Sequence, residues 1–275
     1  MTSRTLIPAL AAASLLTLGC DRAPTEPLRP GNPSFITNGD LDGNAHPAVV
    51  LILMEVRGRP MFLCSGTLIA PKVVLTAGHC AGEPGDFSGI RIYTESDVDN
   101  GNNNFPFAGP NSVEAASWKA HPLYTNSAFF LHDVGVITLT KAVKLAAGQY
   151  GKLPTVDQLD ALQPGNATRF TSVGYGLQRI NPVFIQQDLI RMRAEPHLIQ
   201  INTPGFTGDF SLLLSNNAAT GGTCFGDSGG PNYLGSSNVI AGVTSFGLNG
   251  TCGGTGGVFR LDRQNVLDFV RPFLN

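Results

Sequence analysis

The chain has 275 residues, of which 14% are charged and 33 are glycine, and its formal net charge is −2. This near-neutral charge gives no reason to expect nucleic acid or an acidic membrane surface as a partner. The length allows one large domain or two small ones, and no stretch reaches the roughly 18 apolar residues that a membrane-spanning helix requires.

The first 20 residues have the features of an export signal. A positive charge near the start precedes residues 6–19, an apolar region too short to span a membrane. The ending LLTLGC is similar to a bacterial lipoprotein signal, although Thr17 stands where that pattern usually has leucine. We therefore expect residues 1–20 to be a signal peptide, with lipid on Cys20; an ordinary export signal is the alternative. Either route takes the chain out of the cytoplasm and permits disulfides.

Residues 21–35 contain four prolines and little to bury, which predicts a linker or propeptide ahead of a domain at residues 36–275. From residue 47 onward, short runs rich in Val, Ile, Leu, Phe and Thr are separated by Gly, Pro and Asn. This pattern predicts an all-β sandwich or barrel rather than alternating β/α units. The runs include Met61–Ile69, Ile90–Thr94, Val134–Leu139, Arg169–Val173 and Val239–Phe246.

Two further segments have residue patterns typical of a particular local structure. Residues 97–104 are rich in Asp and Asn, but they lack the glycine and glutamate positions of a calcium-binding EF-hand loop, which favours a solvated turn over a calcium site. At the C-terminus, residues 262–275 place apolar side chains near helical spacing. Asp262 is the expected cap of this helix.

Three short motifs carry candidate chemistry: His79 within LTAGHC, Asp133 within HDVGVITL, and Ser228 within TCFGDSGGP. A serine hydroxyl is a weak nucleophile that needs an adjacent base, and a histidine can accept and return its proton. The glycines around Ser228 permit an unusual backbone, so the N–H groups of Gly226 and Ser228 could form an oxyanion pocket. Taken singly, each motif also has an ordinary explanation: a loop histidine, an acid at a strand edge, and a glycine-rich turn.

Together, the chain order His79, Asp133, Ser228 and the flanking residues resemble the chymotrypsin/trypsin family of serine endopeptidases. This order separates the chain from subtilisins and α/β-hydrolases. The resemblance implies two packed six-stranded antiparallel β-barrels that join near residues 145–165, a C-terminal helix, and an active site in the cleft between the barrels. It implies that Ser228 attacks the peptide bond, that His79 transfers the proton, and that Asp133 orients the histidine, with no cofactor.

The remaining cysteines fit the same resemblance. Once Cys20 is set aside, four cysteines allow three pairings. The resemblance selects Cys64–Cys80, beside the histidine, and Cys224–Cys252, beside the serine. A zinc site is not expected, because these cysteines lack C-x-x-C spacing.

The resemblance also implies activation by cleavage. In the family, a cut frees an isoleucine α-amino group, which inserts and pairs with the aspartate before the nucleophile. Transferred to this chain, Ile36 pairs with Asp227. An ordinary strand start is the alternative for Ile36.

The resemblance places the substrate-binding residues around an uncharged pocket. Gly222 is expected at its floor with Thr223 beside it, and Gly247 and Gly257 are expected as walls. Because no acidic residue stands at the floor, we expect a preference for apolar or aromatic side chains. Ser245 and Phe246 belong to the strand expected to pair with the substrate backbone, and Ser245 is also placed to hydrogen-bond Asp133.

The sequence thus predicts an exported, monomeric serine endopeptidase of bacterial type that acts on protein substrates after an activating protease has cleaved it. The alternative is a catalytically silent relative that serves as a surface-binding or adhesion module. An intact set of His79, Asp133 and Ser228 argues against that alternative, since binding alone does not require all three groups.

Overall fold

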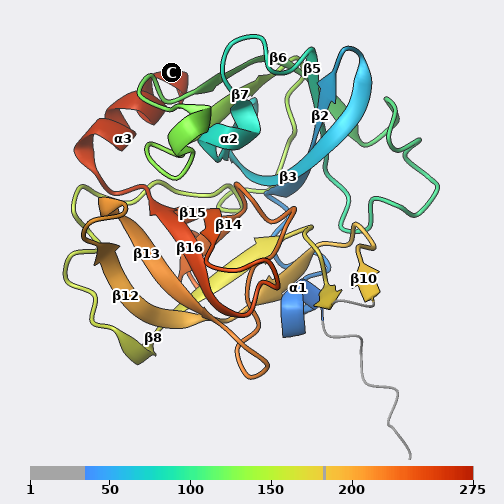
Figure 1. Ribbon diagram of the computed structural model, residues 1–275. Coiled ribbons are helices and arrows are strands. Elements are labelled where there is room, and N and C mark those ends of the chain that lie inside the picture. The colour runs from blue at the N-terminus through green and yellow to red at the C-terminus, as the bar shows by residue number, and fades with distance from the viewer. Residues whose placement is uncertain (1–34, 182–183, 275) are drawn as a thin grey trace, which may run out of the picture. The chain divides into compact units, whose positions relative to one another are not determined.

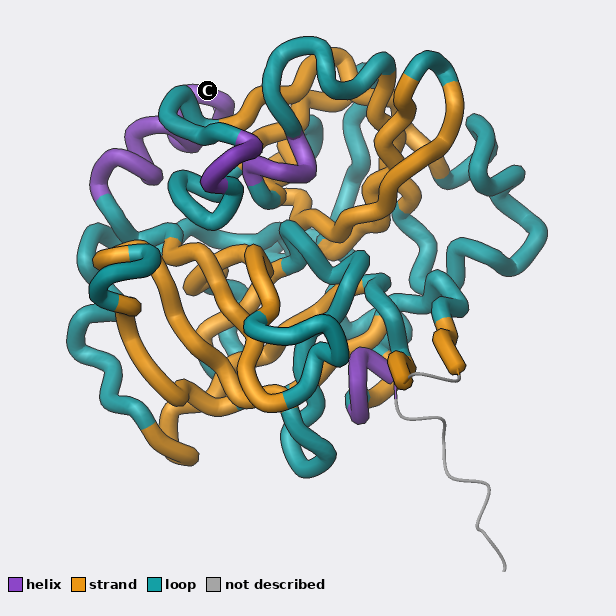
Figure 2. Tube along the Cα trace, in the orientation of Figure 1, coloured by secondary structure: helices purple, strands orange, loops and turns teal. Residues whose placement is uncertain are grey.

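The computed structural model describes residues 35–181 and 184–274. The predicted signal peptide, Cys20 and nearly all of the expected linker lie outside the described residues. Within them, no helix is both long and apolar enough to cross a membrane. Two closed six-stranded antiparallel β-barrels and a C-terminal helix form the fold, which confirms the predicted fold class (Figures 1 and 2).

The first barrel comes from the N-terminal half of the described chain and closes in the order β2-β3-β4-β7-β6-β5. Three of its strands, β2, β4 and β7, are rich in β-branched residues, which favour the pleated conformation. The strands are β2 (Val49–Val56), β3 (Arg59–Ala70), β4 (Val73–Thr76), β5 (Gly89–Tyr93), β6 (Ser112–Ala120) and β7 (Gly135–Leu139).

The second barrel closes because β14 pairs with β8 at one end of the sheet order β8-β12-β13-β16-β15-β14. Its strands are β8 (Gly165–Gly174), β12 (His197–Thr203), β13 (Gly208–Asn216), β14 (Pro231–Leu234), β15 (Ile240–Gly247) and β16 (Gly254–Arg260). Residues 140–164 connect the two barrels. Outside the rings, β1 (Asp40–Leu41) pairs with β11 (Met192–Ala194), which pairs with β8, and β9 (Arg179–Asn181) forms a hairpin with β10 (Phe184–Gln186).

One hydrophobic cluster extends across both barrels, and the second barrel contains a further cluster of its own. Val49–Met54 of β2 are all buried, so both faces of this strand are covered. The same cluster of buried side chains includes Leu51 and Val74 of the first barrel together with Val243 and Phe259 of the second. Each fully buried aliphatic side chain of this kind stabilises the fold by roughly 1.5–3 kcal/mol. The barrels are therefore held together by side chains from both.

The C-terminal helix α3 (Gln264–Val270) continues into a 3-10 turn (Arg271–Leu274), but its predicted cap is wrong. The residue at the cap position is Arg263. Asp262 is instead fully buried, where it accepts hydrogen bonds from Arg260 and from the N–H of Leu159. The buried guanidinium competes for the carboxylate that the sequence pattern assigned to the helix end.

Candidate active site

The barrel register brings His79 and Asp133 together. Strand β4 ends at Thr76, which faces Gly135, the first residue of the antiparallel strand β7. The residues that follow β4 and those that precede β7 therefore emerge side by side at one end of the barrel. His79 lies in the single helical turn α2 (Gly78–Ala81), and Asp133 lies just before β7.

The carboxylate of Asp133 is fully buried and accepts several hydrogen bonds. Its Oδ2 lies 3.0 Å from Nδ1 of His79, and its Oδ1 accepts the backbone N–H of His79 at 2.9 Å. The hydroxyl of Ser245, on β15 of the second barrel, donates to Oδ2 at 2.5 Å. Since a carboxylate only accepts, Nδ1 of His79 carries the proton and Nε2 keeps its lone pair. Nε2 is thus the nitrogen able to act as a base.

The surroundings of His79 set its pKa. Burial by itself would lower the pKa of the imidazole, but the charge and the hydrogen bond of Asp133 outweigh burial and raise the pKa above 6.5. Phe129 also packs edge-on against the ring, with 5.8 Å between centroids. The histidine is therefore held in one orientation by a charged partner on one side and an aromatic ring on another.

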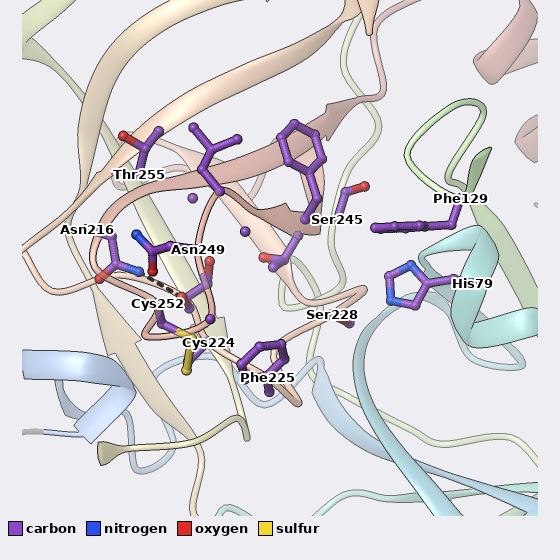
Figure 3. Close-up of a pocket in the computed structure, with 17 residues that line it drawn as sticks. His79, Phe129, Asn216, Cys224, Phe225, Ser228, Ser245, Asn249, Cys252 and Thr255 are labelled. Atoms are coloured by element: carbon purple, nitrogen blue, oxygen red, sulfur yellow. Dashed lines mark hydrogen bonds between the residues drawn. A yellow bond between two sulfur atoms is a disulfide. The ribbon is translucent and has the colours of Figure 1, made fainter. Parts of the chain in front are cut away.

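Ser228 belongs to a loop that is tied to both barrels. Its carbonyl accepts the N–H of Ser65 on β3 at 2.8 Å, and the N–H of Gly229 donates to Thr244 on β15 at 2.8 Å. His79 and Ser228 line the same cavity of about 530 Å³, where Figure 3 shows them beside one another. No hydrogen bond joins these two described residues. Such contacts are often long without substrate and shorten in the reacting complex.

The backbone on either side of Asp227 has the form needed to stabilise an oxyanion. Gly226 has φ of 95°, which disfavours any side chain. Within the described part of the chain, the N–H groups of Gly226 and Ser228 donate to no protein acceptor. Two free N–H groups on one tight turn are suited to bind negative charge that develops on a substrate oxygen.

Asp227 is fully buried, and its only donors among the described residues are the backbone N–H groups of Gly176 and Cys224, at 2.8 and 2.9 Å. Burial raises its pKa to about 7 against the opposing effect of these two bonds. No described cation forms an ion pair with it. The structure therefore holds a fully buried carboxyl group that no described side chain neutralises.

Ile36 is also fully buried, on Met192 and Ala194 of β11. Met192 faces Gly174 in the β8–β11 register, two residues before the Gly176 that donates to Asp227. Ile36 thus packs against β11, whose partner strand β8 leads to the Gly176 that binds Asp227. The short segment α1 (Phe35–Asn38) that contains Ile36 is a turn rather than a regular helix, since Ile36 has φ of 46° and ψ of 125°.

Four predicted substrate-binding residues line the cavity: Thr223, Ser245, Phe246 and Gly247. The other two, Gly222 and Gly257, lie behind neighbouring side chains. A Cβ atom at Gly222 would be 2.2 Å from Cγ of Asn216, and one at Gly257 would be 2.2 Å from the ring of Phe246. The side chains of Asn216 and Phe246 therefore stand where these two glycines were expected to form the surface.

Sequence reasoning missed an aromatic row beside the site. It runs from Phe129 through Phe130 and Phe206 to Phe246, with ring centroids 5.6, 4.2 and 5.3 Å apart. The pair Phe129-Phe130 shortly before Asp133 was a signal in the sequence. Phe206 lies on a distant loop, and only the three-dimensional structure shows where it packs.

Both predicted disulfides are present, Cys64–Cys80 and Cys224–Cys252. Cys64, Cys80 and His79 lie close enough together to suggest a metal site, but both sulfur atoms belong to the disulfide and are not free to bind one. In the 97–104 loop, Asn103 is fully buried and donates to Glu95 and to the carbonyl of Val98, so this residue is not solvated as expected.

Comparisons with known proteins found several similar chains. Brachyurin of Leptuca pugilator is 31% identical over 70% of this chain and 79% of its own length. Collagenase of Hypoderma lineatum is 26% identical over 69% of this chain and 67% of its own length. A solved structure described as HL collagenase superposes with a TM-score of 0.67 at 22% identity, over 86% of this chain and 97% of that one. These relatives do not bear on the expected bacterial origin, which stays a prediction.

The sequence profile of the Trypsin family matches residues 40–269, which include His79, Asp133 and Ser228. This span is most of the chain and contains both barrels. The chain therefore belongs to the trypsin family of serine proteases.

Proposed function

We propose that the protein is an exported serine endopeptidase that hydrolyses peptide bonds through an acyl-enzyme. The observation that carries this proposal is the hydrogen bond that Nδ1 of His79 donates to Asp133, which leaves Nε2 free as a base in the cavity that Ser228 also lines. Family membership supports the reaction class.

In the first half of the reaction, Oγ of Ser228 bonds to the substrate carbonyl carbon and gives its proton to Nε2 of His79. The N–H groups of Gly226 and Ser228 bind the resulting oxyanion, and Asp133 stabilises the imidazolium. The carbon–nitrogen bond then breaks as His79 protonates the departing amine. In the second half, water attacks the ester, again with His79 as base, and Ser228 recovers its proton.

Activation by cleavage between Phe35 and Ile36 is part of the proposal. The buried, raised-pKa carboxyl of Asp227 lacks a described cation, and a new ammonium group at Ile36 would supply one. A positive φ is unfavourable for a β-branched residue, and cutting the preceding peptide bond removes that constraint on Ile36. Because Phe35 precedes the cut, a protease specific for basic residues is not the activator. Residues 21–35 contain no cysteine, so the cut would also free the domain from any lipid on Cys20.

A silent binding module is the competing function, and the fold alone does not exclude it. A solved structure described as a mutant of human heparin binding protein superposes with a TM-score of 0.63 at 18% identity, over 86% of this chain and 95% of that one. The hydrogen bonds between His79 and Asp133 favour an active enzyme over a silent binding module. A direct test is peptide hydrolysis by Ser228→Ala, which we expect to lower kcat by about 10⁶. Retention of more than a hundredth of the activity would place the nucleophile elsewhere.

A further inference from the structure

The far end of the substrate cavity is closed by the side chain of Asn216, the last residue of β13. Asn216 is only 2% exposed, and a Cβ atom at Gly222 would be 2.2 Å from its Cγ and 2.4 Å from its Oδ1. The amide therefore occupies the space that a side chain at position 222 would need. Figure 3 shows Asn216 at the opposite end of the cavity from His79.

Two neighbours fix the orientation of this amide. Its Nδ2 donates to the carbonyl of Thr223 at 2.7 Å, and its Oδ1 lies 2.9 Å from the hydroxyl of Thr37. Thr37 also lies 3.1 Å from the carbonyl of Gly222. A side-chain amide has two N–H groups and two acceptor lone pairs. One N–H and one lone pair of Asn216 thus remain for a ligand.

The groups around Asn216 are polar but uncharged. Thr223, Asn249 and Thr255 line the same end of the cavity, and His79 is the single titratable residue among all the residues that line it. A cationic or anionic side chain would find no countercharge there. A purely apolar side chain would leave the remaining N–H and lone pair of Asn216 buried without partners.

We propose that Asn216 determines specificity by hydrogen-bonding the end of the substrate side chain before the cleaved bond, the P1 side chain. The site then prefers uncharged P1 side chains that end in a hydrogen-bonding group, such as tyrosine or glutamine. This inference rests on the proposed endopeptidase function and narrows its expected apolar or aromatic preference. Since Thr37 follows Ile36 directly, the same contact couples the activation segment to the floor of the cavity.

The test compares matched P1 pairs that differ in the terminal polar group: tyrosine with phenylalanine, and glutamine with methionine. The protein is the full-length chain with residues 31–35 replaced by Asp-Asp-Asp-Asp-Lys, so that enteropeptidase cuts it before Ile36. We expect kcat/KM to favour the polar member of each pair by about 10-fold or more, because a site built to hydrogen-bond discriminates against a ligand that lacks the group. Equal values within each pair would overturn the proposal.

Variants locate the effect at position 216. In Asn216→Leu, the tyrosine-to-phenylalanine ratio should fall to about one while the phenylalanine substrate is still cleaved. Asn217→Leu, at the exposed neighbouring position, should keep the wild-type ratio. If Asn216→Leu does not fold, the comparison of P1 pairs on the unmodified cavity still tests whether the cavity prefers the polar member of each pair. A ratio that persists in a folded Asn216→Leu protein would assign specificity to another residue.

A fluorophosphonate probe reacts with the nucleophile without a P1 side chain. It therefore tests the proposed endopeptidase function separately from the specificity role of Asn216. Labelling of Ser228 together with equal rates within each P1 pair would leave the protease standing and remove the role of Asn216. Absence of both labelling and hydrolysis in folded, cut protein would overturn the proposed function and this inference with it.

Discussion

The hydroxyl of Ser245 donates a hydrogen bond of 2.5 Å to Asp133 and so links the second barrel to the carboxylate that orients His79. Both residues are buried, and they lie on opposite barrels. His79 is thereby positioned by groups from both halves of the fold, although the chain supplies them more than 100 residues apart.

Replacing Ser245 by alanine should weaken both stability and catalysis. The buried carboxylate loses one donor, which should lower the free energy of unfolding by about 1–3 kcal/mol. We expect kcat to fall by about tenfold, because Asp133 is held less firmly. Denaturant unfolding and steady-state kinetics measure the two effects. Ser237→Ala, which removes an exposed turn hydroxyl, is the matched control. Equal behaviour of the two variants would show that the Ser245 hydroxyl contributes nothing.

The pH dependence of activity should reflect the protonation of His79. Because only the neutral imidazole can accept the proton of Ser228, kcat/KM should rise with pH through the raised pKa of His79, with a midpoint above 6.5. In Asp133→Asn the midpoint should move to lower pH, and kcat should fall by a factor on the order of 10⁴. A midpoint that stays in place in Asp133→Asn would contradict the assigned cause of the shift. The raised pKa also stabilises the fold below pH 6.5, and that contribution is lost as pH rises through the folded-state pKa.

Asp227 should make the uncut chain less stable as pH rises. Its pKa is about 7 in the folded chain and 3.8 as a reference, so folding takes up a proton between these values. The free energy of unfolding should therefore decrease from pH 4 to 7, by up to about 4 kcal/mol from this residue. Asp227→Asn should remove this decrease, and so should cleavage before Ile36, which supplies a paired ammonium group. Thermal unfolding across this pH range tests it. If the free energy of unfolding depended on pH equally in the uncut chain, in Asp227→Asn and in the cut chain, the pairing of Ile36 with Asp227 would be ruled out.

A stacked histidine pair should make the chain more stable as pH rises, which is the opposite of the effect of Asp227. His121 and His132 lie with ring centroids 5.0 Å apart, next to Phe269 of α3. Burial lowers the pKa of both, and His132 further lowers that of His121, so unfolding takes up protons and stability falls as pH drops below 6.5. His132→Asn should reduce this acid sensitivity, and asparagine tolerates the φ of 53° at this position. Unfolding curves at pH 5 and 7 measure the difference. An equal loss of stability in both proteins would contradict this role.

The sequence was sufficient where local pattern decides the structure. Short apolar runs separated by Gly, Pro and Asn predicted a sandwich or barrel, and the family resemblance of the motif flanks narrowed this to the two barrels that the structure has. The sequence was insufficient where packing between distant segments of the chain decides which side chain fills a space. Gly222 was expected at the pocket floor, yet its missing side chain lets Asn216 take that place. Asp262 was expected to cap α3, yet the buried Arg260 binds it instead. Neither outcome follows from spacing, because each depends on which side chain from another part of the fold fills a space.

The most direct test of the central proposal is labelling by a fluorophosphonate probe, with mass spectrometry to locate the adduct. The protein is the full-length chain that enteropeptidase can cut before Ile36, examined before and after the cut, with Ser228→Ala as control. We expect an adduct on Ser228 after cleavage, little before it, and none in the variant. An equal adduct before cleavage would keep Ser228 as nucleophile and remove the activation step. A folded, cut protein that carries no adduct on Ser228 would contradict the assignment of this chain as a working serine endopeptidase.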